Sequence, residues 1–250
     1  MKYLKLFESW NPLSDEDFAN VQELHKIGVV SDQELRELKK LRDAEQRIIN
    51  YSGVGDLDLG GCTLIKSLPQ DLKVARHLNL TGCIGLTSLP NGLKVGATLT
   101  VAGCILLKSL PADLKVGGNL ALGGCTNLES LPADLEVEGH LNVSDCISLR
   151  SLPAGLKVSG DIYLHGCINL ESLPADLKVG ASLNLRDCIS LTSLPAGLTV
   201  TRQLGLSGCT DLKSLPADLE VGGDLYLYGC TSLKSLPQDL KVAGRIIGDK

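Results

Sequence analysis

Cysteine recurs along the chain at a fixed interval, and a regular array of thiols could bind a metal or form disulfides. The interval is always 21 residues, and the nine positions are Cys62, Cys83, Cys104, Cys125, Cys146, Cys167, Cys188, Cys209 and Cys230. Zinc needs four ligands that converge on one point, and a disulfide needs two Cβ atoms that face each other. Equivalent positions of a stacked repeat form a parallel row instead. We therefore expect no metal and no cofactor, and interpret the cysteines as small buried residues at a turn.

Serine and histidine could supply a nucleophile and its base. A serine follows every cysteine in the same register, from Ser67 to Ser235, but no histidine accompanies it at a fixed spacing. His140 and Asp161 occupy the same position of adjacent repeats and could lie side by side. The sequence indicates no nucleophile and no cleft that would make such a pair catalytic. We expect the serine hydroxyls to satisfy backbone groups of a turn and the chain not to be an enzyme.

Lysine forms a third column, which Glu136 and Glu220 interrupt. Its members are Lys73, Lys94, Lys115, Lys157, Lys178 and Lys241, and two residues before them runs an aspartate column of Asp71, Asp113, Asp134, Asp176, Asp218 and Asp239. Mixed charge of this kind is typical of a solvated face, and a site for an anionic polymer is the alternative. The net charge of −5, with both signs spread along the chain, indicates no basic face for nucleic acid.

All these columns belong to one repeat, C-x-x-L-x-S-L-P-x-x-L-x-V-x-x-x-L-x-L-x-x, present in nine copies. Aromatic residues make up only 3% of the chain, and a nearly pure aliphatic core built from repeated shapes is typical of solenoids. The segment HLNLTGC (77–83) alternates apolar and polar residues, which predicts a strand with Leu78 and Leu80 inside. The recurrent proline predicts a tight turn or a short 3₁₀ segment on the other side. A second short strand there is equally open, because Leu-Lys-Val alternates again.

The motif L-x-L-x-G-C-x-x-L resembles the leucine-rich-repeat signature in its cysteine-containing form. The S-L-P-x-x-L half is similar to the short bacterial repeats of secreted effectors from enteric pathogens. Together the two motifs cover about residues 53–250. The resemblance implies an α/β solenoid of nine units, coiled right-handedly, with a parallel β-sheet on one face and short turns or second short strands on the other.

Residues 1–52 follow a different pattern and are expected to form an N-terminal helical cap. Ser14 with Asp17, and Ser31 with Glu34, are capping-box openings. We predict two helices, over 15–27 and 32–50, that form a hairpin and cover the unpaired edge of the first coil. No secretory signal and no membrane-spanning stretch is indicated. Because nine cysteines cannot all pair internally, we expect a reducing, cytoplasmic location in the producing cell or a host cell.

The outward-facing strand positions vary among the nine copies while the framework positions hardly change. Three of the five tyrosines fall on this face, and tyrosine and arginine are favoured anchors of interfaces. We predict that a protein partner binds there, on a cluster in the C-terminal half: Asp161, Tyr163, His165, Arg186, Asp224, Tyr226 and Tyr228. Unconstrained drift of solvent-facing positions is the alternative explanation of the variation.

A second functional class is a structural or self-assembling rod. The segment from Arg245 to Gly248 begins a tenth strand, and no polar capping unit is apparent after it. Ile246 and Ile247 would then mediate self-association, as in a homodimer formed through the C-terminal edge. An ice-binding surface ranks lower, because it requires a regular threonine lattice and the outward residues are irregular.

Overall fold

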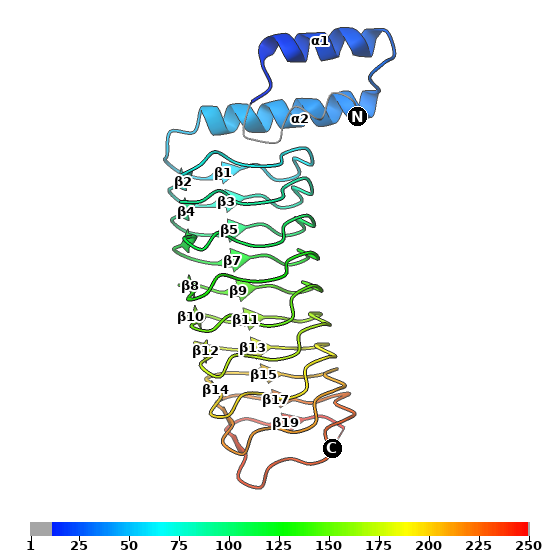
Figure 1. Cartoon of the computed structure of the whole chain (residues 1–250). Helices are drawn as coiled ribbons and strands as arrows, with labels where there is room; N and C mark the ends of the chain where they lie inside the picture. The colour runs from blue at the N-terminus through cyan, green and yellow to red at the C-terminus, as the bar shows by residue number, and fades with distance from the viewer. Residues whose placement is uncertain (1–11, 250) are drawn as a thin grey trace.

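Two helices precede the repeats in the computed structural model, which describes residues 12–249 (Figure 1). Helix α1 (Asp15–Lys26) and helix α2 (Asp32–Ile49) agree with the predicted ranges to within one residue at their ends. The Ser31 hydroxyl accepts the Glu34 backbone N–H while the Glu34 carboxylate accepts the Ser31 N–H, so the capping box at α2 is complete. Residues 1–11 of the predicted N-terminal unit lie outside the described residues.

Helix α2 packs against the first coil of the repeats (Figure 1). Leu41, Ala44 and Ile48 are buried in the same apolar core as the leucines of the coils. Two polar contacts join the helix to that coil. The Thr63 hydroxyl donates to the Glu37 carboxylate at 2.5 Å, and the Arg47 guanidinium donates to the Asp58 carbonyl at 2.9 Å. Helix α1 lies beyond α2 and contacts it through a separate small cluster that includes Phe18 and Val21.

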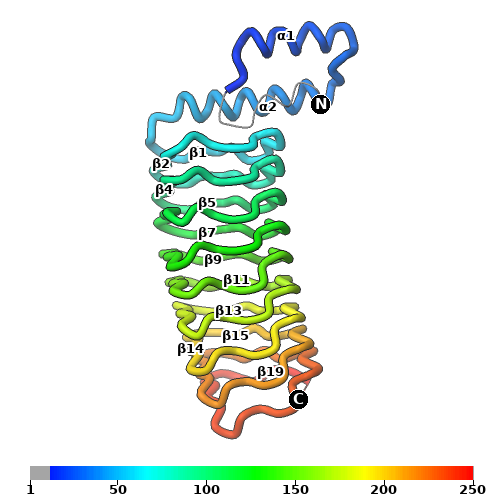
Figure 2. Tube along the Cα trace, in the orientation of Figure 1, coloured from blue at the N-terminus to red at the C-terminus, as the bar shows by residue number. Residues whose placement is uncertain are grey.

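The repeats form a parallel β-solenoid of about nine turns, stacked as a rod with the C-terminus at the end opposite the helices (Figure 2). One sheet has ten strands: β1 (Leu57–Asp58), β3 (Leu78–Asn79), β5 (Leu99–Thr100), β7 (Leu120–Ala121), β9 (Leu141–Asn142), β11 (Ile162–Tyr163), β13 (Leu183–Asn184), β15 (Leu204–Gly205), β17 (Leu225–Tyr226) and β19 (Ile246–Ile247). Neighbouring strands pair in parallel with a shift of one repeat, as Leu57 with Leu78. The predicted parallel sheet is confirmed.

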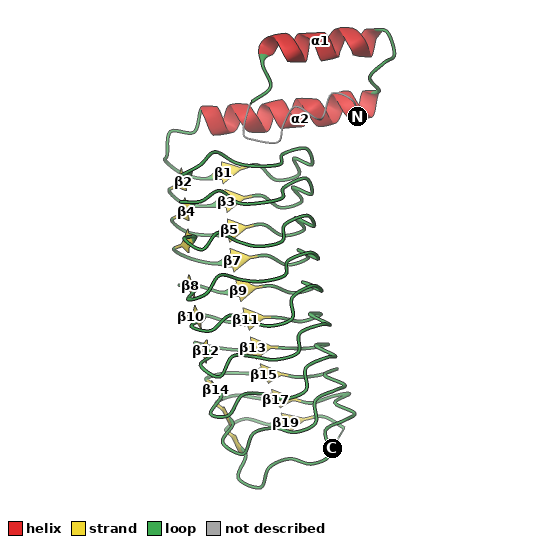
Figure 3. Ribbon diagram, viewed as in Figure 1, coloured by secondary structure: helices red, strands yellow, loops and turns green. Residues whose placement is uncertain are grey.

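A second sheet runs along the other side of the rod, and turns and loops connect the two (Figure 3). Its nine strands are β2 (Lys73–Val74), β4 (Lys94–Val95), β6 (Lys115–Val116), β8 (Glu136–Val137), β10 (Lys157–Val158), β12 (Lys178–Val179), β14 (Thr199–Val200), β16 (Glu220–Val221) and β18 (Lys241–Val242). The second short strands are therefore confirmed. The lysine column is exposed, and two of its members form ion pairs of 2.6 Å within it, Lys157 with Glu136 and Lys241 with Glu220.

Each coil turns sharply at the residue before its cysteine, which has a left-handed backbone conformation. Glycine occupies this position in seven coils, with φ between 68° and 80°, and Asp145 and Asp187 occupy it in the other two, with φ of 57° and 59°. Glycine adopts this conformation without a steric cost, and aspartate tolerates it better than most residues. The turn directs the cysteine side chain into the core, where all nine cysteines are buried.

The buried thiols form a hydrogen-bonded ladder that the sequence did not predict. Cys83 donates its S–H to the Leu59 carbonyl of the preceding coil at 3.2 Å. The same contact recurs at 3.0–3.3 Å from Cys104 to Cys230. Burial raises the pKa of Cys83 to about 12. The described residues contain no cluster of side chains suited to hold a metal ion.

The serine column does not behave as predicted. From Ser88 to Ser235 these residues are exposed, and among residues 12–249 none of their hydroxyls hydrogen-bonds a turn backbone group. The backbones of four of them pair instead, Ser151 with Ser172 and Ser193 with Ser214. Neither described helix combines the length and apolar character that crossing a bilayer would require.

Candidate functional site

The outward positions of the ten-stranded sheet form one continuous face of the solenoid. Side chains alternate along each strand as predicted: Leu78 and Leu80 are fully buried, whereas Asn79 between them is only partly buried. Tyr163 and Tyr226 lie on this outward face, half-buried, at equivalent positions of β11 and β17. The alternation therefore places both tyrosines where a partner could reach them.

A groove of about 690 Å³ lies between these two tyrosines. We call it the tyrosine groove; its lining includes Tyr163, Ser182, Asn184, Arg186, Asp187, Gln203, Gly205, Ser207, Tyr226 and Tyr228. The register runs from Tyr163 through Asn184 and Gly205 to Tyr226. Because neighbouring strands lie about 4.8 Å apart, the two tyrosine positions are roughly 14 Å apart. Gly205 leaves open the space beside Tyr226 that a side chain would fill.

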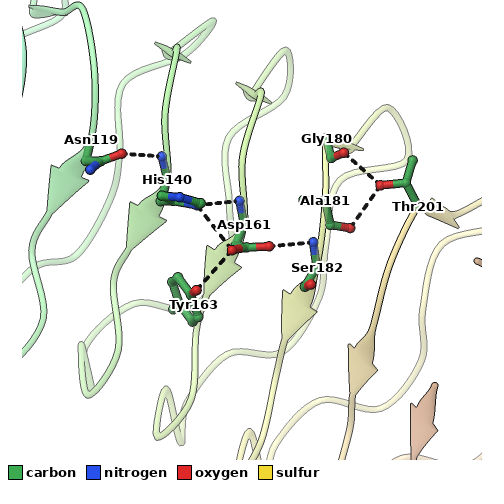
Figure 4. A network of polar contacts seen from close by, with 8 residues as sticks. All are labelled: Asn119, His140, Asp161, Tyr163, Gly180, Ala181, Ser182 and Thr201. Carbon is green, nitrogen blue, oxygen red and sulfur yellow. Dashed lines mark hydrogen bonds and ion pairs between the residues drawn. The ribbon is translucent and has the colours of Figure 1, made fainter. Parts of the chain in front are cut away.

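Each tyrosine is held by an aspartate two residues before it. The Tyr163 hydroxyl donates to the Asp161 carboxylate at 3.0 Å, and the Tyr226 hydroxyl donates to the Asp224 carboxylate at 3.4 Å (Figure 4 shows the first pair). Partial burial, reinforced by the hydrogen bond to Asp161, raises the pKa of Tyr163. These hydrogen bonds thus restrain both rings, the shorter contact at Tyr163 more than the longer one at Tyr226.

The two carboxylates also accept hydrogen bonds from backbone N–H groups of the following coil. Asp161 accepts the Ser182 N–H at 2.8 Å, and Asp224 accepts the Arg245 N–H at 2.8 Å. Burial tends to raise the pKa of Asp161, but the hydrogen bonds from Ser182 and Tyr163 outweigh it and lower that pKa. At Asp224 the hydrogen bonds from the Arg245 backbone and side chain lower the pKa. These predicted site residues therefore position the tyrosines and join adjacent coils.

The same role extends to His140, which the sequence placed beside Asp161. Its Nδ1 lies 3.2 Å from the Asp161 carboxylate and accepts the Asp161 backbone N–H at 2.9 Å, so the neutral ring carries its hydrogen on Nε2. The His140 N–H in turn donates to the Asn119 side chain at 2.8 Å (Figure 4). Several side chains at this first outward position accept a backbone N–H group of the next coil. The choice of residue there is therefore set in part by structure, and neither random drift nor recognition alone explains its variation.

The remaining predicted residues divide between the groove and its surroundings. Arg186 lines the groove and forms an ion pair with Asp187 at 3.2 Å. Tyr228 also lines it and is 51% exposed. His165 points elsewhere: its Nδ1 lies 2.8 Å from the hydroxyl of Ser144, a buried residue one coil closer to the N-terminus. Four of the seven predicted residues therefore meet in one groove, two aspartates support it, and His165 lies outside its lining.

No family model, curated protein or solved structure matches the chain. The tyrosine groove is the feature of the described residues that bears most directly on function. Sequence reasoning missed its floor, formed mainly by Ser182, Asn184, Gln203, Gly205 and Ser207. One signal was available: Gly205 is the only glycine at the middle outward position, and Tyr226 follows it by one repeat.

Proposed function

We propose that this chain is a leucine-rich-repeat protein of the short, cysteine-containing type, and that it binds a protein partner in the tyrosine groove without catalysing a reaction. The parallel strand followed by a buried cysteine in every coil supports the family assignment. The buried cysteine thiols fit a reducing compartment, and we propose a cytoplasmic location, in the producing cell or in a host. The helices would cap the first coil, as terminal units of solenoids usually do.

The functional proposal is based on the shape and chemistry of the tyrosine groove. Its tyrosine walls offer large apolar surfaces with polar tips, which are characteristic of interface anchors. Their hydroxyls are already fixed by Asp161 and Asp224. The volume of about 690 Å³ falls within the range of binding clefts. Such a preformed site on one continuous face supports recognition over random drift of the outward positions.

Replacing both Tyr163 and Tyr226 by alanine is expected to abolish capture of the partner while leaving the fold intact, because both side chains are outside the core. Capture by the immobilised full-length chain, with crosslinking and mass spectrometry to identify the contact, provides the measurement. Circular dichroism and thermal unfolding verify folding of the variant. Unchanged capture by the double variant would rule out the groove as the binding site.

A self-assembling rod is the second candidate, favoured by the C-terminal end of the described solenoid. Strands β18 and β19 are edge strands of the two sheets, and exposed edges can pair with further chains. Ile246 is 44% exposed, whereas Leu225, its register partner in the preceding coil, is fully buried. Leu236, Leu240 and Val242 are also only partly buried. A second copy of the chain could cover this surface.

If self-assembly occurs through this edge, the chain will form oligomers that increase with concentration, and Ile246→Lys with Ile247→Lys will return it to a monomer. The charged side chains would be costly to bury between two chains. Light scattering after size exclusion at several concentrations measures the mass. A wild-type chain that stays monomeric over the full range would contradict this second candidate.

A further inference from the structure

On the outward face some side chains accept a backbone N–H group and others do not, and several of the N–H groups without an acceptor among the described residues lie at the tyrosine groove. In several coils an asparagine at the middle outward position accepts the N–H two residues later; Asn184 accepts that of Arg186 at 3.0 Å. Gly205 and Tyr226 cannot provide this acceptor. Among residues 12–249, the backbone N–H groups of Ser207 and Tyr228 consequently have no acceptor.

Likewise, only some side chains at the first outward position accept a backbone N–H group. Asp161 and Asp224 each accept the N–H of the residue one repeat later, but Ser182 and Gln203 do not. Within the described chain, the N–H groups of Gln203 and Asp224 therefore also lack an acceptor. Three of these four donors, those of Gln203, Ser207 and Tyr228, belong to residues that line the groove, and the fourth, that of Asp224, lies in the same coil as Tyr226.

Three carboxylates around the groove and the side chain of Asn184 are, by contrast, already engaged as acceptors. The carboxylates of Asp161 and Asp224 hold tyrosine hydroxyls and backbone N–H groups. The Asp187 carboxylate pairs with Arg186, and the Asn184 side-chain oxygen accepts the Arg186 N–H. A ligand that supplies hydrogen-bond acceptors and offers apolar surface to the tyrosine rings would therefore match the groove.

Other modes of peptide recognition fit this groove poorly. Strand addition requires a sheet edge, whereas the groove lies on the face of the sheet. An amphipathic helix requires a continuous apolar floor, and the polar side chains of Ser182, Asn184 and Gln203 interrupt the floor here. Phosphopeptide recognition uses clustered arginines, but Arg186 is the one arginine among the described residues of the groove lining and is paired with Asp187.

We propose that the partner enters the tyrosine groove through a proline-rich segment in the polyproline II conformation; this inference rests on the proposed function of the groove. Proline has no N–H, and the carbonyls of a polyproline II chain are unpaired. The segment thus presents acceptors to the four free N–H groups and pyrrolidine rings to the tyrosines. At about 3.1 Å per residue, four to five residues span the roughly 14 Å between Tyr163 and Tyr226.

Titration of the ¹⁵N-labelled full chain with decaproline tests this inference by NMR. The amide resonances of Gln203, Ser207, Asp224 and Tyr228 are expected to shift progressively and to saturate. The amides of Ala102 and Gly123 provide a matched internal control, because they also lack an acceptor among the described residues but have no tyrosine beside them. A glycine-serine peptide of equal length and a neutral oligosaccharide, maltohexaose, are titrated in parallel.

Three outcomes would overturn the inference: no shift with decaproline, equal shifts at Ala102 and Gly123, or saturation with maltohexaose but not with decaproline. Partner capture that still depends on Tyr163 and Tyr226 would then show that the groove binds a segment of different chemistry. Capture that is independent of both tyrosines would instead remove the proposed function itself. The two failures are therefore distinguishable.

Discussion

Raising the pH from about 9 to about 11 is expected to unfold this protein through its cysteine column. Burial raises the pKa of Cys83, Cys104, Cys167 and Cys209 to about 12 and that of Cys125 to about 11, from an ordinary value of 9.0. The native chain keeps protons that the unfolded chain releases, so the free energy of unfolding falls as the pH rises above 9. Below that pH these thiols leave the stability unchanged.

The expected size of this effect is large because the thiols act together. Each contributes a loss of about 1.4 kcal/mol per pH unit between the unfolded and native pKa values. The five thiols named above would therefore remove about 7 kcal/mol per pH unit once fully ionised in the unfolded chain. A typical domain is stable by only about 5–15 kcal/mol, so one to two pH units above 9 should suffice for unfolding.

Denaturant unfolding at pH 7, 9, 10 and 11, followed by circular dichroism, measures this dependence. Lysines and tyrosines also titrate near pH 10, so the matched control is Cys104→Ala, in which the slope with pH should decrease by about 1.4 kcal/mol per pH unit. The native thiols should also resist iodoacetamide at pH 8 and react once unfolded. A stability that does not change between pH 9 and 11, or rapid labelling of the native chain, would contradict the buried ladder.

The main architecture followed from the sequence because each coil repeats the same alternation. The inward leucines, the buried cysteines and the parallel pairing one repeat apart all rest on the period of the motif. The strands are nevertheless only two residues long. Backbone hydrogen bonds between coils continue beyond the strands, as from the Gly82 N–H to the Ala102 carbonyl at 2.8 Å. Side chains add to them: Asn79 accepts the Thr81 N–H at 3.0 Å, and Cys83 donates to the Leu59 carbonyl. Hydrogen bonds of this kind depend on three-dimensional geometry that periodicity does not specify.

The candidate site was predictable only in part for a related reason. Tyr163, Arg186, Tyr226 and Tyr228 could be chosen by residue type, and the register then places them in one groove. The sequence also identified Asp161, Asp224 and His140 as outward polar residues. Only the structure shows that each accepts a backbone N–H group of the next coil. His165 was chosen by position alone, and its contact with Ser144 places it outside the groove lining.

Filling the groove is the second change with a large expected effect. In Gly205→Tyr the new side chain would occupy the space between Tyr163 and Tyr226 without removing either ring. The strand should accept it, because the equivalent positions of β11 and β17 already carry tyrosine. A Cβ at Gly205 would meet the Asn184 side-chain oxygen at 3.2 Å, which requires only a small shift of that side chain. Ala121→Tyr places the same residue at the equivalent position of β7, outside the groove, and is the matched control.

The affinity of the captured partner for these two variants, measured by isothermal titration calorimetry beside the unsubstituted chain, tests the recognition surface most directly. Gly205→Tyr should weaken binding by about 2 kcal/mol or more, roughly 30-fold in Kd, as expected for obstruction of the centre of an interface. Ala121→Tyr should leave Kd within about twofold of the unsubstituted chain. Equal affinity of all three proteins, or a greater loss with Ala121→Tyr than with Gly205→Tyr, would contradict binding in the tyrosine groove.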